Sequence, residues 1–170
     1  MDTSFVNQCM LTCIGNKRKL VKEINKIVAR DIVPKMNKPK LDIFDGFAGS
    51  SVVSRSLIHY ADNLYVNDME PYSYIMAKTF FEKPNESQKQ LVIKHIKTMN
   101  ELAENGPFYE GIITKNYCPE DTKHPKLGER CFYTRENGLI IDTLRKYIEE
   151  NVEEDIQHYC LSQLLIKSSK

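Results

Sequence analysis

A glycine-containing loop and an acidic residue 23 positions after its first residue have the types and spacing of a cofactor site. The loop Asp45-Gly46-Phe47-Ala48-Gly49-Ser50 joins a short apolar segment to a helical one. Glycines at such a turn allow backbone to approach a ligand, and the N–H groups that begin the next helix favour anionic groups. Asp68 follows the next apolar segment, where a carboxylate can accept hydrogen bonds from both ribose hydroxyls. Together these features predict a site for a nucleoside-containing cofactor.

Other interpretations of the loop stay open. A tight turn in any α/β protein can contain two such glycines, and the loop matches neither G-x-G-x-x-G nor the phosphate-binding P-loop. A nicotinamide-dependent oxidoreductase would also fit the glycine turn and Asp68. Asn67-Asp68 at the end of a strand favours a cofactor site over a plain turn.

The elements around the loop read as an α/β unit. An amphipathic stripe predicts a helix over residues 17–33, closed by Pro34 and Pro39. Short apolar runs predict strands at residues 40–45 and 64–67, with a helix between them that starts near Val52. A further helix is expected from Pro71 to Phe81. Strand, helix and strand in this order imply a parallel sheet.

The second half of the sequence is mainly helical. The pattern predicts helices over residues 87–104 and from an N-cap at Thr134 through Ile148, separated by a loop-rich run over 105–130. Acidic residues 149–155 are expected to be the solvated start of a last helix that is still running at Lys170. Three histidines are placed in helical segments: His59, His95 and His158.

Composition and charge exclude several classes of protein. The 170 residues are 41% hydrophobic and 28% charged, which excludes disorder, and no segment is apolar enough for a membrane span or a signal peptide. A cytoplasmic location is therefore expected. Cys118, His124 and Cys131 match no common zinc-finger spacing, so no metal site is predicted. The net charge of +1 conceals a basic N-terminus, with nine basic and three acidic residues in positions 1–40. Its lysines can contact phosphates or form a solvated face.

Four parts of the sequence resemble one protein family in collinear order. The loop from Asp45 to Ser50 resembles the D-x-F-x-G-S/T loop of S-adenosylmethionine-dependent DNA methyltransferases, and Asn67-Asp68 is similar to their acidic motif. Residues 14–20, Ile-Gly-Asn-Lys-Arg-Lys-Leu, look like the Y-I-G-x-K-x-x-L element of the Dam-type adenine-specific group. Residues 128–138 and 141–145 resemble a segment that lies between the acidic and catalytic motifs of that family.

The resemblance implies a fold, a reaction and a set of roles. The expected fold class is α/β, a partial Rossmann-like methyltransferase sheet with a mainly helical insertion. Residues 1–82 would bind S-adenosylmethionine, 83–150 would be the DNA-recognition insertion, and 151–170 would begin a helix returning to the methyltransferase domain. The expected reaction, of the kind found in restriction-modification systems, methylates the exocyclic amino group of adenine in double-stranded DNA. The residues implied for the cofactor are Gly15, Lys17, Asp45, Phe47, Gly49, Ser50 and Asp68, and those for DNA are Lys17, Arg18, Lys19, Arg130 and Arg135.

The sequence departs from the family pattern in three places. Cys13 stands where an aromatic residue is usual, and Ser51 replaces the last glycine of the cofactor loop. The catalytic Asp-Pro-Pro-Tyr motif is missing, because no two prolines are adjacent, so no catalytic residue is assigned. We therefore expect an N-terminal portion of a methyltransferase that is inactive alone and needs a C-terminal half or a second chain. The alternative is a non-catalytic nucleic-acid-binding or pairing subunit on a methyltransferase-like scaffold.

Overall fold

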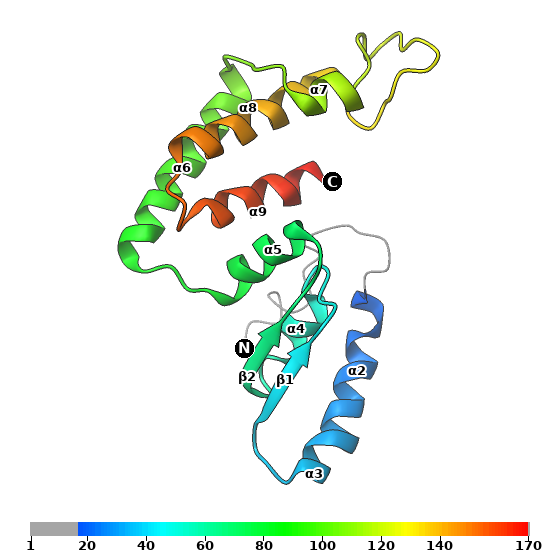
Figure 1. The fold of residues 1–170 in the computed structure, drawn as a ribbon, viewed down its shortest axis with the longest axis vertical. Coiled ribbons are helices and arrows are strands. Elements are labelled where there is room, and N and C mark those ends of the chain that lie inside the picture. Colours follow the sequence, from blue (N-terminus) through cyan, green and yellow to red (C-terminus); the bar gives the residue numbers. More distant parts are fainter. Residues whose placement is uncertain (1–16, 170) are drawn as a thin grey trace. The chain divides into compact units, whose positions relative to one another are not determined.

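In the computed structural model, which describes residues 17–169, the chain forms two compact units (Figure 1). The first comprises residues 17–83 together with Ser169, and the second comprises Pro84–Ser168. Cys13 and Gly15 lie outside the described residues. The predicted functional divisions after residues 82 and 150 stay predictions.

The first unit begins with a helical segment that is continuous past its proline. It consists of η1 (Arg18–Leu20), α2 (Val21–Ile27), a π-helical turn η2 (Val28–Ile32) and α3 (Val33–Met36). The prediction that Pro34 closes this helix is wrong. Proline lacks an N–H, and its ring clashes with the carbonyl four residues back in a regular α-helix, whereas the wider π turn ahead of Pro34 accommodates it. The helix ends where Asn37 adopts a left-handed φ of 48°.

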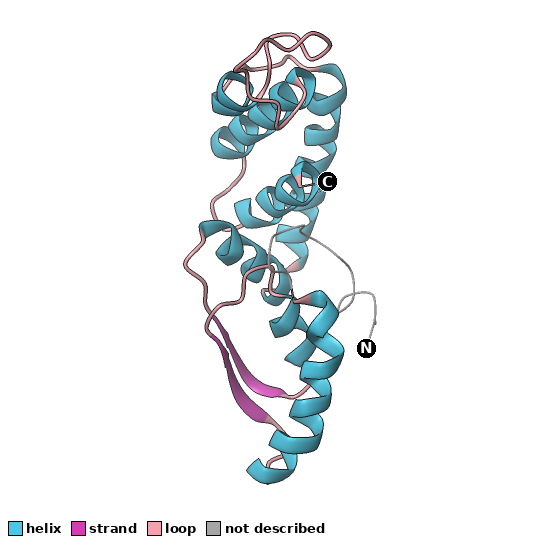
Figure 2. Ribbon diagram, turned by 90° about the vertical axis from the view of Figure 1, so that its right-hand side faces the viewer, coloured by secondary structure: helices cyan, strands magenta, loops and turns pink. Residues whose placement is uncertain are grey.

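A two-stranded parallel sheet follows, as predicted. Strands β1 (Leu41–Asp45) and β2 (Ala61–Val66) pair in parallel, with α4 (Val52–Leu57) between them in sequence (Figures 1 and 2). β2 begins three residues earlier than the predicted strand. Helix α5 (Pro71–Phe81) has the predicted bounds. The described residues thus confirm a mixed α/β fold, and the parallel register brings the ends of both strands, Asp45 and Val66, side by side.

The second unit is helical, and three long helices form its core. These are α6 (Glu86–Asn105), α8 (Arg135–Asn151) and α9 (Gln157–Ser168). The Thr134 side chain accepts a hydrogen bond from the Asn137 N–H, which confirms the predicted N-cap. The buried core residues are Met99, Leu144, Ile148, Val152, Ile156 and Cys160. His95 and His158 lie in helices as predicted, whereas His59 of the first unit lies in the turn between α4 and β2.

One prediction for the second unit is wrong, and one region contains a helix that was not predicted. The loop-rich run over 105–130 contains the short helix α7 (Ile112–Tyr117). The acidic residues 149–155 do not start the last helix: α8 continues to Asn151, and α9 begins only at Gln157. Val152 and Ile156 explain the break, because the turn between the helices places both side chains in the core. No described helix has the length and apolar character needed to cross a membrane.

A hydrogen-bonded histidine connects α6, α8 and the turn before α9. His95 Nδ1 lies 2.9 Å from the Tyr147 hydroxyl, and its Nε2 lies 3.1 Å from Glu153 Oε2. The backbone N–H of Glu153 and the bond to His95 hold the pKa of this carboxyl below its ordinary value of 4.5. A lowered pKa means that the carboxylate stabilises the fold above about pH 4.5, and that this contribution is lost as the pH falls through the folded-state pKa.

We therefore expect Glu153→Gln to lower the melting temperature at neutral pH, but not at a pH low enough to protonate Glu153 in the wild type. Melting curves of both proteins between pH 7 and pH 3, followed by circular dichroism, measure the difference. Glu154→Gln changes the neighbouring exposed carboxylate and is the matched control. A wild-type advantage that stayed constant down to pH 3 would contradict the assignment.

Candidate functional site

The loop between β1 and α4 is tied to the end of β2 by backbone hydrogen bonds. The Asn67 N–H donates to the Asp45 carbonyl at 2.9 Å, and the Ala48 N–H donates to the Asn67 carbonyl at 3.0 Å. Gly49 adopts a φ of +52°, and a Cβ added there would meet no atom within 4 Å. The backbone conformation therefore favours glycine at this position, which opens onto free space.

Asp68 joins the two predicted motifs directly. Its Oδ2 accepts a hydrogen bond of 2.7 Å from the Gly49 N–H, although the two residues are 19 positions apart. Its Oδ1 accepts one of 3.0 Å from the Glu70 N–H. These backbone donors, with that of Glu70 the strongest, hold the pKa of Asp68 below its ordinary range. The carboxylate is therefore ionised at neutral pH, and each oxygen retains a lone pair for a further donor.

Asp45 is also held in place, in this case by a serine. Ser54 of α4 is fully buried, and its hydroxyl donates to Asp45 Oδ2 at 2.5 Å. The other carboxylate oxygen has no hydrogen bond among the described residues, so it can accept one from a ligand. Nothing in the sequence pattern singled out Ser54, since a serine three residues after Ser51 is unremarkable in a helix.

Two apolar side chains beside these carboxylates are almost fully exposed. Phe47 in the loop is 95% exposed, and Met69, directly after Asp68, is 92% exposed. Phe47 was among the predicted cofactor residues and Met69 was not, although its place next to the acid could have indicated it. Exposed apolar side chains around an ionised carboxylate suit a ligand with a flat apolar part and hydroxyl groups.

Ser51 departs from the family pattern at a cost that the structure shows. It adopts a left-handed φ of +55°, a conformation that favours glycine. Its side chain is fully buried, and within residues 17–169 its hydroxyl has no hydrogen-bond partner. The loop keeps the backbone conformation of a glycine at this position while it carries a serine.

Ser51→Gly is expected to stabilise the first unit by about 1 kcal/mol. The change removes the left-handed strain and an unsatisfied hydroxyl, and it adds back some entropy of the unfolded chain. Urea unfolding followed by circular dichroism measures the difference, and hydrogen exchange of peptides from residues 45–60 assigns it to this loop. Ser51→Ala, which removes only the hydroxyl, should gain less. A Ser51→Gly protein less stable than the wild type would contradict this account.

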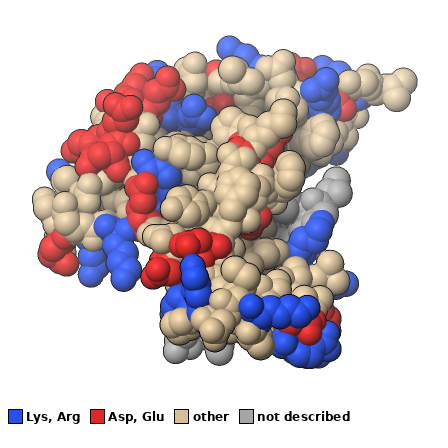
Figure 3. Space-filling model, turned by 60° about the horizontal axis from the view of Figure 1, so that its bottom comes forward, with Lys and Arg blue, Asp and Glu red and all other residues tan. Residues whose placement is uncertain are grey.

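The basic residues predicted to contact DNA belong to both units. Lys17, Arg18 and Lys19 are exposed at the start of the N-terminal helix. Further along this helix, Lys26 pairs with Glu23 and Arg30 pairs with Asp31. Figure 3 likewise shows basic and acidic side chains next to one another on the face that it draws. The N-terminal segment is therefore less positive than its lysine count suggests.

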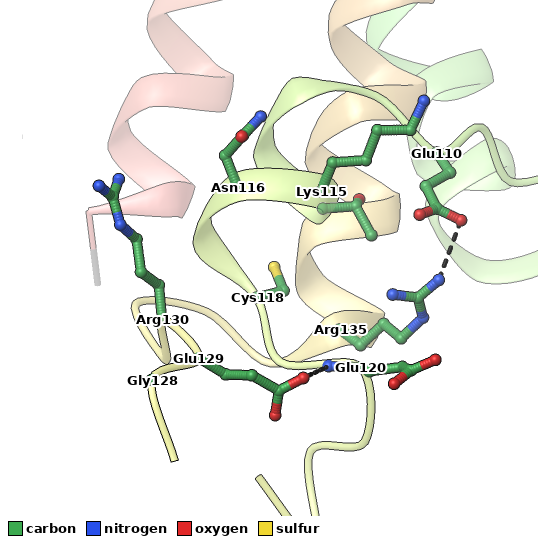
Figure 4. A pocket seen from close by; sticks show the side chains of 10 residues that line it. Glu110, Lys115, Asn116, Cys118, Glu120, Gly128, Glu129, Arg130 and Arg135 are labelled. Carbon is green, nitrogen blue, oxygen red and sulfur yellow. Dashed lines mark hydrogen bonds and ion pairs between the residues drawn. The ribbon is translucent and has the colours of Figure 1, made fainter. Parts of the chain in front are cut away.

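Arg130 and Arg135 line a pocket of about 550 Å³ in the second unit (Figure 4). The guanidinium of Arg135 donates to Glu110 Oε2 at 2.9 Å, whereas that of Arg130 lies 5.4 Å from the centre of the Tyr117 ring. The structure therefore brings the two arginines to one pocket but gives them different surroundings. In the part of the chain that the structure describes, no His, Cys, Asp and Glu side chains group as a metal site would require.

A buried carboxylate positions α7, one wall of this pocket. Asp142 of α8 accepts hydrogen bonds from the N–H groups of Gly111, Ile113 and Thr114 at 2.9, 3.0 and 2.8 Å, and from the Thr114 hydroxyl at 2.6 Å. A Cβ added at Gly111 would lie 2.7 Å from Asp142 Oδ1, so only glycine fits there. Asp142 therefore fastens the start of α7 to α8.

Comparisons with known proteins agree with the family that the motifs resemble. Residues 14–170 match the sequence profile of the D12 class N6 adenine-specific DNA methyltransferases. The Type II methyltransferase M.NlaIII of Neisseria lactamica is 30% identical over 169 residues, which cover 92% of this chain and 45% of that protein. The Type II methyltransferase M.CviAII of Paramecium bursaria Chlorella virus 1 is 26% identical over 155 residues, which cover 89% of this chain and 43% of the relative.

The chain thus spans a little under half the length of these curated relatives. No solved structure matches it. Because the profile match extends over nearly the whole sequence, the chain belongs to the D12 class N6 adenine-specific DNA methyltransferase family.

Proposed function

We propose that this chain supplies the S-adenosylmethionine site and the DNA-recognition part of an enzyme that methylates the exocyclic amino group of adenine in double-stranded DNA. The observation that carries the proposal is the bond between Asp68 and the Gly49 N–H, which joins the acidic motif to the glycine loop. In this proposal the Rossmann-like fold begins with β1, α4, β2 and α5.

The residues around Asp68 fit the parts of S-adenosylmethionine. Asp68 accepts hydrogen bonds from the ribose hydroxyls, because both of its oxygens retain lone pairs. Asp45 and the loop residues Phe47, Gly49 and Ser50 surround the methionine part, and the Ser54 hydroxyl orients Asp45 for the cofactor's amino group. Met69 offers an apolar surface to the adenine ring. Gly15 and Lys17, from the N-terminal element, are proposed to close over the cofactor.

The proposed DNA contacts divide between the two units. Lys17, Arg18 and Lys19 lie at the N-terminal helix, and Arg130 and Arg135 lie at the pocket of the second unit. When bound, S-adenosylmethionine supplies the methyl group. The acid and aromatic residue that prepare the adenine amino group in the family are missing from this sequence, because it contains no Asp-Pro-Pro-Tyr segment. We therefore expect the 170-residue chain to bind the cofactor only weakly and to transfer no methyl group.

Isothermal titration of the full chain with S-adenosylhomocysteine, NADH and ATP tests the cofactor assignment. We expect heat of binding with S-adenosylhomocysteine alone. Binding of NADH instead would favour a nicotinamide-dependent enzyme, and no binding of any of the three would reject the proposed cofactor site. In a second assay, transfer of tritium from labelled S-adenosylmethionine to adenine-containing duplexes should stay at background level.

A further inference from the structure

The pocket of the second unit is lined by cations, carboxylates and an amide. Two of its walls are α7 and the loop that follows this helix. The side chains of Lys115 and Asn116 extend from α7, and that of Arg130 extends from the loop (Figure 4). Three carboxylates also line it, those of Glu110, Glu120 and Glu129. Because three cations, counting Arg135, face three carboxylates, the lining carries no net charge.

All three carboxylates are engaged within the unit. Glu110 pairs with Arg135, and Glu120 pairs with Lys126 at 2.5 Å. Glu129 accepts hydrogen bonds from the Glu120 N–H at 3.0 Å and from the Lys126 N–H at 2.5 Å. These backbone donors lower the pKa of Glu129, with that of Lys126 the stronger. Glu120 and Glu129 therefore link the two sides of the loop, and Glu110 holds the Arg135 guanidinium in place.

Three polar side chains of the lining have capacity left for a ligand. Neither Lys115 nor Arg130 forms an ion pair within residues 17–169, and the Arg130 guanidinium is held only over the Tyr117 ring. Asn116 donates one hydrogen bond to the Ile112 carbonyl at 2.9 Å, and among the described residues its oxygen and second N–H have no partner. Lys115 and Asn116 are exposed and adjacent at the end of α7.

We propose that this pocket reads base edges in the major groove of DNA, with Arg130 and Asn116 as the residues that determine sequence preference. The inference rests on the proposed function and adds which residues select the sequence. A site for phosphate alone would carry a net positive charge, whereas base edges offer both donors and acceptors and suit a lining of mixed charge. Arginine pairs with the O6 and N7 of guanine, and asparagine pairs with the N6 and N7 of adenine.

The geometry also gives Lys115 and Arg135 separate roles. Arg135 builds the wall through Glu110, and its backbone N–H donates to the Thr122 hydroxyl at 2.9 Å. Lys115 is exposed near the end of α7, so it can contact a phosphate next to the bases. Asp142 fixes the start of α7, and therefore the place from which Asn116 is presented.

The test is selection of bound duplexes from a pool with a randomised centre, using the full chain and sequencing of the bound fraction. We expect the wild type to enrich a motif. Arg130→Ala should lose discrimination at a guanine position, and Asn116→Ala at an adenine position, each by about 5- to 150-fold. Affinity for an unrelated duplex should change by less than about 3-fold, because base contacts add little to non-specific binding.

Matched controls come from the same unit. Arg145→Ala removes an exposed arginine of α8 outside the pocket, and Asn151→Ala removes an asparagine that also bonds the carbonyl four residues back. Both should leave the motif unchanged.

Three results would overturn the inference. One is an unchanged motif in both pocket variants. Another is a uniform loss of affinity with a weaker salt dependence, which marks phosphate contacts. The third is a wild type that binds DNA without enriching any sequence. A wild type that binds no duplex would remove the inference together with the DNA part of the proposed function, while the cofactor titration would still decide the rest.

Discussion

Replacing Asp142 with alanine is expected to lower the free energy of unfolding of the second unit by about 3–5 kcal/mol. The buried carboxylate accepts four hydrogen bonds, from Gly111, Ile113 and both donors of Thr114. Its removal leaves three N–H groups and a hydroxyl without acceptors, and each unsatisfied buried donor costs about 1–3 kcal/mol. Since a whole domain is stable by about 5–15 kcal/mol, this is one of the largest effects that a single substitution can have here.

The loss should be local first. Because α7 is anchored at its start by Asp142, hydrogen exchange of peptides covering residues 109–118 should speed up before exchange in α6 or α9 does. Urea unfolding of the full chain followed by circular dichroism gives the global effect. Asp142→Asn keeps the shape and one acceptor, so it should cost less and should fold even if the alanine variant does not.

Asp155→Ala is the matched control for this experiment. Asp155 is an exposed aspartate of the same unit, and it accepts one hydrogen bond, of 2.8 Å, from Gln88 Nε2. Its loss should cost less than about 1 kcal/mol. Equal effects of Asp155→Ala and Asp142→Ala, or unchanged exchange in α7 of the Asp142→Asn protein, would show that α7 is held by something else.

Asp142 also explains why α7 could not be predicted from the sequence. Residues 105–130 contain three prolines and three glycines, as expected of a loop, and α7 has only six residues. Its start is fixed by a carboxylate that lies 28 residues after Thr114. A helix that depends on so distant a contact has no local signal in the sequence. Helix α8 was predictable because its N-cap, Thr134, accepts a hydrogen bond from an N–H only three residues away.

The cofactor loop shows the opposite case. The pairing of Asp45 with Val66 follows from two short apolar runs separated by a helix, so the meeting of the glycine loop and Asp68 could be predicted from the pattern. The pattern could not show which hydrogen-bond donors bind each carboxylate. The bonds from Ser54 to Asp45 and from Gly49 to Asp68 depend on atomic distances, as does the left-handed backbone of Ser51.

Asp68→Asn is expected to weaken S-adenosylhomocysteine binding by the full chain by about 100-fold or more. The substitution removes a charged acceptor, and hydrogen bonds to charged groups contribute about 1.5–3 kcal/mol each. It also changes the bond to the Gly49 N–H. In the wild type the N–H groups of Gly49 and Glu70 each bind one carboxylate oxygen, whereas an amide has only one acceptor oxygen for the two donors. The loss therefore combines a missing partner for the ribose with a less firmly held loop.

These two contributions can be separated by the choice of ligand and by a control. Adenosine, which carries the ribose without the amino-acid part, should lose affinity for the variant by a similar factor if Asp68 binds the ribose directly. Asp62→Asn changes an exposed aspartate of β2 away from the loop, and it should bind both ligands as the wild type does. If Asp68→Asn lost affinity for S-adenosylhomocysteine but kept it for adenosine, Asp68 would act on the loop alone. If neither affinity changed, the acid after β2 would have no part in cofactor binding.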